Sequence, residues 1–284
     1  MICDICPRKC KVERSKNRGF CGVKEKIVIS KVMLHQFEEP VISVGKGSGA
    51  IFFAGCNLKC VFCQNYKISH TGKGKRVSVK GLVKIFKKLE KVGAANINLV
   101  TPTQFSLQII EALKLYKPKI PVVWNSSGYE SVETIKKLKD LVDVFLVDLK
   151  YSNNELAMRY SGANNYVENA KAVIVAMRKL KPKDVIENGV MTAGLIVRHL
   201  VLPNNTADSI ECLRFVLNKL GKDTIVSIMS QYQPVFRACE FEEINRKLKP
   251  IEYKRVVNFA IENDMKNCYV QDLTSADSKY TPKF

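Results

Sequence analysis

Short apolar runs and amphipathic helical patterns alternate along this chain from residue 49 onward. Strands are predicted at the short apolar runs 49–55, 96–101, 122–128, 143–150, 194–203 and 224–232. Between these runs, apolar residues recur every three or four positions and predict helices at 78–93, 105–116, 131–142, 153–161, 166–181 and 206–220. The alternation indicates the α/β class, with a parallel sheet that is covered by crossover helices.

This alternation alone is compatible with a full or partial barrel and with an open doubly wound sheet. In either arrangement a ligand binds at the carboxyl ends of the strands. A cysteine loop at 54–65 follows the first predicted strand, and polar segments follow four later ones, at 101–103, 125–128, 148–150 and 202–205. We therefore expect these segments to meet at one pocket.

The pattern divides the chain into three parts. Residues 1–45 hold a cysteine-rich, metal-binding extension and an alternating segment at 26–45 that reads as a hairpin or edge strands. Residues 46–235 form the predicted barrel core. Residues 236–284 form an extension with one amphipathic helix and a short apolar run, so its character is mainly helical.

Composition limits the functional classes. The chain has 284 residues, and 46 Lys and Arg residues against 27 Asp and Glu residues give a net charge of +19. This charge favours an anionic partner, although most lysines lie on the exposed faces of predicted helices, and only the segment 70–76 forms a compact basic loop. The absence of a long apolar run or an N-terminal secretory pattern predicts a cytoplasmic protein that does not span a membrane.

The ten cysteines are distributed unevenly, with seven in the first 63 residues. Because cytosolic thiols are kept reduced, clustered cysteines predict metal ligands or catalytic groups and not disulfides. Cys212, Cys239 and Cys268 are isolated, and we interpret them as core or incidental thiols.

Cys56, Cys60 and Cys63 form a CxxxCxxC pattern in the loop after the first predicted strand. Structural zinc prefers four ligands that close its coordination shell, which disfavours zinc here. Thiolates also bind iron–sulfur clusters, where four irons usually take four cysteines. Three thiols would leave one iron free for another ligand.

The segment GCNLKCVFCQN (55–65) resembles the cysteine loop of the radical S-adenosylmethionine (SAM) superfamily. The resemblance implies a partial (β/α)6 barrel and a 4Fe-4S cluster held by Cys56, Cys60 and Cys63. It also implies that the amino and carboxylate groups of SAM chelate the remaining iron. In this family the reduced cluster cleaves SAM to a 5′-deoxyadenosyl radical, which abstracts hydrogen from a substrate.

Within the superfamily, residues 49–205 resemble glycyl-radical activating enzymes of the pyruvate formate-lyase type and their uncharacterised relatives. The segments FLVDLKY (145–151) and RHLVLPNN (198–205) carry this resemblance together with the cysteine loop. It implies an oxidoreductase that generates a glycyl radical on a partner protein, with flavodoxin or ferredoxin as its electron donor.

The resemblance also implies cofactor contacts. Phe62 matches an aromatic position whose backbone lies near adenine. Thr101 and Thr103 stand in place of a Gly-Gly-Glu segment beside the methionine amino group, which is a departure from the family pattern.

Asp148 matches a residue that helps bind a monovalent cation, and Lys150 matches one that approaches the methionine carboxylate. Both project to one side because they are alternate residues of a strand, although a surface ion pair would have the same pattern. Asn125 replaces a carboxylate of the cation site. His199 is a candidate cofactor contact or a buried histidine of the core or rim.

Cys3, Cys6, Cys10 and Cys21 form a second cysteine group, in the first 25 residues. Four thiols can close a shell, so we favour structural zinc over an auxiliary iron–sulfur cluster. Two other functions remain open from the sequence. The charge would suit an RNA-modifying radical enzyme, and the cysteines alone would suit a noncatalytic metal-binding scaffold.

Overall fold

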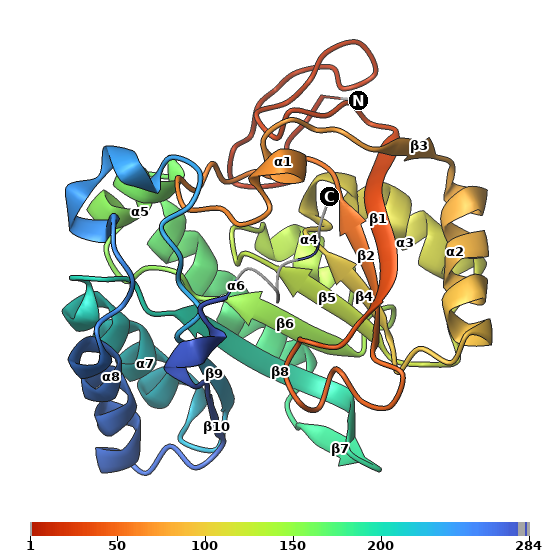
Figure 1. Ribbon diagram of the computed structural model, residues 1–284. Coiled ribbons are helices and arrows are strands. Elements are labelled where there is room, and N and C mark those ends of the chain that lie inside the picture. The colour runs from red at the N-terminus through yellow and green to blue at the C-terminus, as the bar shows by residue number, and fades with distance from the viewer. Residues whose placement is uncertain (1, 278–281, 283–284) are drawn as a thin grey trace.

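The six predicted strands form the centre of one curved sheet in the computed structural model (Figure 1), which describes residues 2–277 and 282. They are β2 (Ser48–Phe53), β4 (Ile97–Val100), β5 (Val122–Ser126), β6 (Val144–Asp148), β8 (Val190–Leu200) and β9 (Ile225–Met229). Each pairs in parallel with the next one along the chain. A doubly wound sheet would reverse its strand order at a switch point, whereas this sheet winds in one direction as a barrel does. The prediction of an α/β fold with a parallel sheet is confirmed.

Four further strands extend this parallel centre. β1 (Ile27–His35) runs antiparallel to β2, and β3 (Lys75–Val77) runs antiparallel to β1. β10 (Cys268–Val270) adds a parallel strand to β9, and β7 (Val185–Glu187) pairs antiparallel with β8. β10 and β3 lie at opposite ends of the strand order, so the barrel is partial. Of the hairpin or edge strands predicted at 26–45, the structure has β1 followed by a loop.

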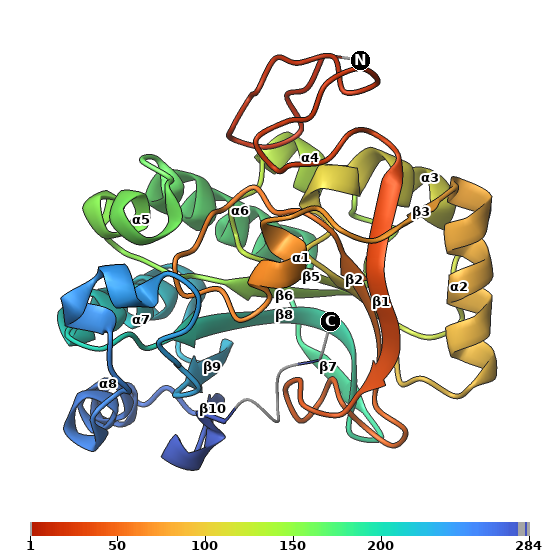
Figure 2. The ribbon, with the colours of Figure 1, turned by 45° about the horizontal axis from the view of Figure 1, so that its top comes forward.

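The helices lie around the outside of the sheet, as Figure 2 shows, whereas α1 lies over its inner face. Their bounds are α1 (Tyr66–Ser69), α2 (Val79–Lys91), α3 (Ser106–Leu115), α4 (Val132–Lys136), α5 (Asn154–Ser161), α6 (Tyr166–Leu180), α7 (Thr206–Leu220) and α8 (Pro250–Glu262). The helix predicted at 131–142 is shorter than expected, since α4 ends at Lys136 and tight turns follow. Within the described residues, no helix combines the length and the apolarity that crossing a bilayer would require.

The loop at 36–47 closes the amino-terminal end of the barrel. Its Val41 and Ile42 pack inside the sheet in an apolar cluster with Val123, Val144, Leu146, Met191, Ile196 and Ile225. A hydrogen bond from Met191 N to Val41 O (2.9 Å) fixes the loop against β8. Because apolar side chains fill this end, any cavity inside the barrel has to lie toward the carboxyl ends of the strands.

Candidate active site

The cysteine loop follows β2 and is fixed by backbone contacts on both sides. Gly55 N donates to Ile68 O (3.0 Å), and Val61 N donates to Tyr160 O at the end of α5 (2.9 Å). Gly55 has φ +78°, and a Cβ atom at this position would lie 2.4 Å from Cys21 O. Only glycine therefore allows the loop to approach the N-terminal segment this closely.

Each thiol of the loop lies beside a hydrogen-bond donor. Leu58 N donates to Cys56 Sγ (3.4 Å), the Ser161 hydroxyl donates to Cys60 Sγ (2.9 Å), and the Ser69 hydroxyl lies 3.2 Å from Cys63 Sγ. Burial, reinforced by the neighbouring Cys60 thiol, raises the pKa of Cys56 to about 12 and that of Cys63 to about 11. Thiols in such a site hold their protons until a metal displaces them, and the donors then stabilise the metal-bound thiolates.

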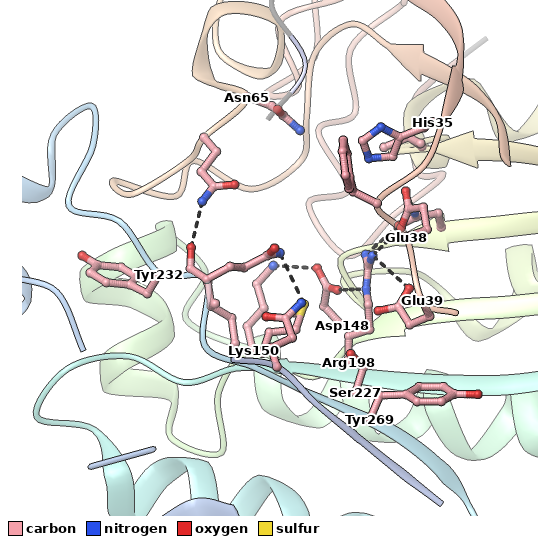
Figure 3. A pocket seen from close by; sticks show the side chains of 18 of the residues that line it. His35, Glu38, Glu39, Asn65, Asp148, Lys150, Arg198, Ser227, Tyr232 and Tyr269 are labelled. Carbon is pink, nitrogen blue, oxygen red and sulfur yellow. Dashed lines mark hydrogen bonds and ion pairs between the residues drawn. The ribbon is translucent and has the colours of Figure 1, made fainter. Parts of the chain in front are cut away.

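A pocket of about 480 Å³ opens beneath this loop, inside the barrel (Figure 3). Cys60, Phe62 and Cys63 line it from the loop, and Glu38 and Glu39 line it from the segment that closes the barrel. Asn125, Asp148, Lys150, Arg198 and Ser227 line it from the ends of β5, β6, β8 and β9. Three of the five segments that were expected to converge here therefore do so, namely the cysteine loop, 125–128 and 148–150, whereas no residue of 101–103 or 202–205 lines the pocket.

Arg198 joins the charged groups of the pocket. Its Nε donates to Asp148 Oδ1 (2.8 Å), its Nη2 to Asn125 Oδ1 (2.7 Å) and its Nη1 to Glu38 Oε2 (3.2 Å). The Lys150 ammonium binds the other Asp148 oxygen at 2.7 Å. The guanidinium thus lies between Asn125 and Asp148, the two residues that the family resemblance associates with a monovalent cation.

The pKa shifts follow from burial and from these contacts. Burial alone would raise the pKa of Asp148, but Arg198 and Lys150 outweigh it and hold this pKa below its usual value. Burial raises the pKa of Glu38, and it raises that of Glu39 to about 7 although Arg198 opposes the shift. The ion pairs therefore keep Asp148 ionised, whereas the second glutamate is only partly compensated.

Not all the predicted site residues reach the pocket. Of the ten residues expected to hold the cluster or SAM, six line it, namely Cys60, Phe62, Cys63, Asn125, Asp148 and Lys150, whereas Cys56 does not. Thr101 N donates to Asn125 O (2.9 Å) outside the lining, and the Thr103 hydroxyl donates to Glu130 Oε1 (2.7 Å). His199 is buried, with Nδ1 2.7 Å from Leu149 O and with Nε2 lacking a hydrogen-bond partner.

Sequence reasoning missed the acidic side of the pocket. Glu38 and Glu39 lie in a segment that was predicted as a hairpin, and nothing in its pattern indicates that it enters the barrel. Arg198 could have been found, because it pairs in register with Asp148 across parallel strands and shares its side of the sheet. Tyr232 and Tyr269, which also line the pocket, had no such signal.

The N-terminal cysteines share a second, much smaller cavity. Cys3, Cys6, Cys10 and Cys21 line it together with Arg8, Arg14, Asn57 and Gln104. Each of these four polar side chains has one buried nitrogen or oxygen without a hydrogen-bond partner. In the part of the chain that the structure describes, no three His, Cys, Asp or Glu side chains are grouped so that they could hold a single metal ion. Side-chain rotations would be needed to draw the four thiols around one.

Hydrogen bonds join the N-terminal cysteine group directly to the cysteine loop. Cys56 N donates to Cys21 O (3.3 Å), and Arg8 Nε donates to Asn57 O (2.8 Å). The Asn57 side chain in turn donates to Tyr129 O. Cys56, the first cysteine of the loop, is therefore positioned by the last cysteine of the N-terminal group.

Comparisons with known proteins agree with this geometry. Residues 50–216 match the family model of the Radical SAM superfamily. The uncharacterized protein MJ0674 of Methanocaldococcus jannaschii is 36% identical over 267 residues, which cover 91% of this chain and 74% of that protein. The pyruvate formate-lyase 1-activating enzyme of Escherichia coli is 27% identical over 146 residues, 47% of this chain and 58% of that enzyme.

Solved structures show the same fold at lower identity. SuiB of Streptococcus suis bound to the precursor peptide SuiA has a TM-score of 0.52 and 13% identity, and the match covers 78% of this chain but about half (48%) of SuiB. Methylornithine synthase (PylB) has a TM-score of 0.50 and 12% identity, over 76% of this chain and 68% of that enzyme. Since the family model spans more than half of the chain, this protein belongs to the radical SAM superfamily of enzymes, which use a 4Fe-4S cluster and SAM.

Proposed function

We propose that this chain is an activating enzyme, which cleaves SAM reductively and removes a hydrogen atom from a glycine of a partner protein. The observation that carries the proposal is the loop of three closely spaced thiols, Cys56, Cys60 and Cys63, of which Cys60 and Cys63 line a charged pocket inside the barrel. The similarity to the pyruvate formate-lyase 1-activating enzyme supports the glycine as the hydrogen donor.

The thiols of the cysteine loop fit a cluster with one open iron. We assign Cys56, Cys60 and Cys63 as its ligands, and Phe62, Asn125, Asp148 and Lys150 as contacts of SAM. Thr101, Thr103 and His199 are assigned to the same cofactor from the resemblance alone. The bound cofactors would supply an electron and a 5′-deoxyadenosyl radical.

The chain's own residues orient the cofactor and keep water away. The Lys150 ammonium, fixed by Asp148, is placed to receive a carboxylate from the pocket. Arg198 provides a fixed positive charge where the related enzymes are expected to bind a monovalent cation. We therefore expect SAM cleavage to proceed at the same rate in sodium, potassium and choline buffers. Activation by one of these cations would contradict this role of Arg198.

The test of the proposed function has two readouts. Reconstituted protein, reduced anaerobically, should form methionine and 5′-deoxyadenosine from SAM. The protein is then incubated with an extract of cells that were grown on deuterated glycine, and deuterium should be transferred into the 5′-deoxyadenosine. Cleavage without transfer from glycine would retain the SAM chemistry but contradict the activating role, and absence of cleavage would contradict both.

The four cysteines of the N-terminal group are proposed to bind one metal centre. The unpartnered polar atoms around their cavity support this assignment, because buried polar groups without partners are unfavourable and a charged centre would interact with them. We favour zinc, with a second iron–sulfur cluster as the alternative. Metal analysis of Cys56→Ala protein should find about one zinc per chain, whereas residual iron and sulfide would assign a second cluster.

Partners of this enzyme are proposed from surface charge. A groove of about 440 Å³ beside the N-terminal cysteine group is lined by five basic side chains and one acidic one, Arg18, Lys24, Lys26, Lys73, Arg76 and Glu25. We propose that an acidic electron donor of the flavodoxin or ferredoxin type docks there in the cytoplasm. RNA is the second candidate, because a basic groove also attracts phosphates; salt-sensitive RNA binding that is lost in K73A/R76A protein would favour it.

We also propose that the chain is organised as an N-terminal metal-binding part (1–45), the radical SAM core (46–235) and a C-terminal extension (236–284). Contacts of β1 with β2 and of β10 with β9 support close attachment of the two outer parts to the core. Limited proteolysis of the folded protein would test these boundaries.

A further inference from the structure

The acidic floor of the main pocket is not explained by cluster or SAM binding. Glu38 and Glu39 lie at the end of the pocket where the segment 36–47 closes the barrel, whereas Cys60 and Cys63 line it from the loop (Figure 3). Between them the pocket has apolar walls, which include Val100, Leu200 and Met229. A second molecule can therefore lie between the cofactor and the carboxylates.

The charges of this pocket do not balance. Asp148, Glu38 and Glu39 carry three negative charges when ionised, and Lys150 and Arg198 carry two positive charges. All five side chains are between 5% and 18% exposed. The described residues that line the pocket include no other lysine or arginine, and burial lowers the pKa of His35, which leaves that ring neutral. One negative charge is left without a partner of its own.

Glu39 is the carboxylate that the protein leaves incompletely satisfied. Its residue is 7% exposed, and its nearest cationic atom is Arg198 Nη1 at 3.9 Å, beyond hydrogen-bond distance. Its Oε2 atom has no hydrogen-bond partner. Glu38, in contrast, receives hydrogen bonds from Asn98, Asn125 and Arg198. This oxygen is itself buried, so a cationic ligand that displaces the atoms covering it would supply the charged hydrogen bond that it lacks.

On the basis of the proposed function, we infer that Glu39 binds an aliphatic ammonium or guanidinium group of the substrate. The apolar walls fit the methylene stem of such a group, and the carboxylate fits its charged end. The substrate is accordingly a lysine- or arginine-containing segment of the partner protein or a free amine, and the site of hydrogen abstraction lies above this anchor, toward the cysteine loop.

Binding of labelled peptides to reconstituted, SAM-loaded protein tests this inference. The probes are acetylated pentapeptides with a central glycine followed by lysine, arginine, norleucine or citrulline, and free lysine serves as a competitor. Wild-type protein should bind the lysine and arginine peptides about tenfold more tightly than their uncharged counterparts, as expected for a charged hydrogen bond. If free lysine displaces the peptide at the same concentration at which the peptide saturates its site, the anchor binds a free amine.

Variants locate the effect. Glu39→Gln should remove the preference for charged peptides, Glu39→Asp should retain part of it, and Glu187→Gln, at an exposed position on β7, should bind as wild type. Equal binding of lysine and norleucine peptides by wild-type protein would overturn the inference. The inference would also be overturned if Glu39→Gln protein lost as much affinity for SAM as for the charged peptides, because the carboxylate would then belong to the cofactor site. Formation of 5′-deoxyadenosine, measured without peptide, separates failure of this inference from failure of the proposed function.

Discussion

The cysteine loop and the N-terminal cysteine group use the same side chain in two different environments. Cys60 and Cys63 of the loop line a pocket of about 480 Å³, and each of the three loop thiols has a hydroxyl or amide neighbour. The N-terminal group has four thiols around a cavity that is far smaller and is lined by two arginines. Under the proposed assignments, the number of thiols and the space beside them separate a reactive centre in the loop from a closed one in the N-terminal group.

Removal of a loop thiol should have the largest effect. Cys56→Ala, Cys60→Ala and Cys63→Ala each remove a ligand of the proposed cluster, and we expect SAM cleavage to fall below detection in every case. Cys212→Ala, which removes a buried thiol far from both cysteine groups in sequence, should retain iron, sulfide and cleavage. Full activity of any loop variant would contradict the ligand assignment, as would loss of the cluster from the Cys212 variant.

Removal of an N-terminal thiol should affect stability more than chemistry. Cys6→Ala leaves three ligands for a centre that we expect to need four, so the free energy of unfolding should fall by about 3 kcal/mol or more. The 5′-deoxyadenosine formed per intact cluster should stay within about threefold of wild type. Thermal unfolding and turnover, measured on the same anaerobic sample, check this. If Cys6→Ala protein kept its melting temperature but lost turnover, the N-terminal cysteine group would serve chemistry and not stability.

The buried carboxyl of Glu130 should make stability depend on pH. Burial raises the pKa of Glu130 to about 7, although the Thr103 hydroxyl and the Trp124 indole donate to its Oε1. Because this pKa is raised above the ordinary glutamate value of 4.5, the folded state binds the proton more tightly, and stability should decrease as the pH rises from 4.5 through 7. Glu130→Gln should remove a loss on the order of 2–3 kcal/mol between pH 5 and 8. If wild-type and Glu130→Gln protein had the same dependence of unfolding free energy on pH, the raised pKa would not belong to Glu130.

The smallest expected effect concerns the hydrogen-bond donors beside the thiols of the cysteine loop. Ser161→Ala removes the hydroxyl that donates to Cys60 Sγ and should make the cluster potential more negative by tens of millivolts, since one such hydrogen bond contributes about 1 kcal/mol. Tyr151→Phe is the matched control, because it removes the other hydroxyl partner of Ser161 and leaves the donor to sulfur in place. A redox titration followed by spectroscopy should separate the two variants; equal potentials would show that this hydrogen bond has no influence.

Much of the fold was predictable because its pattern is repetitive. All six residues of β2 and all five residues of β5 are buried, as expected for strands covered on both faces, and their apolar runs are visible in the sequence. The helix from Val79 to Lys91 begins after Ser78, whose side chain accepts from Gly81 N, and a serine before an amphipathic run is a capping pattern visible in a sequence.

The site was predictable where local spacing, a strand end or the family resemblance identifies the residue. The three cysteines of the loop are close in sequence, so their grouping needed no knowledge of the fold. Arg198 and His199 are neighbours on β8 and therefore point to opposite sides of the sheet; the arginine reaches the pocket, and the histidine does not. Glu38 and Glu39 enter through a loop whose path depends on distant apolar contacts, so no local pattern reveals them.

The close contact between Gly55 and Cys21 would link the assembly of the two proposed metal centres. The N-terminal segment is synthesised first, and the carbonyl of its last cysteine accepts a hydrogen bond from Cys56 N. If zinc organises that segment, the chain cannot shape its iron–sulfur loop correctly in a cell that lacks zinc, even when iron and sulfide are plentiful. Production of the active enzyme would then respond to the supply of two metals, although only one of them takes part in electron transfer.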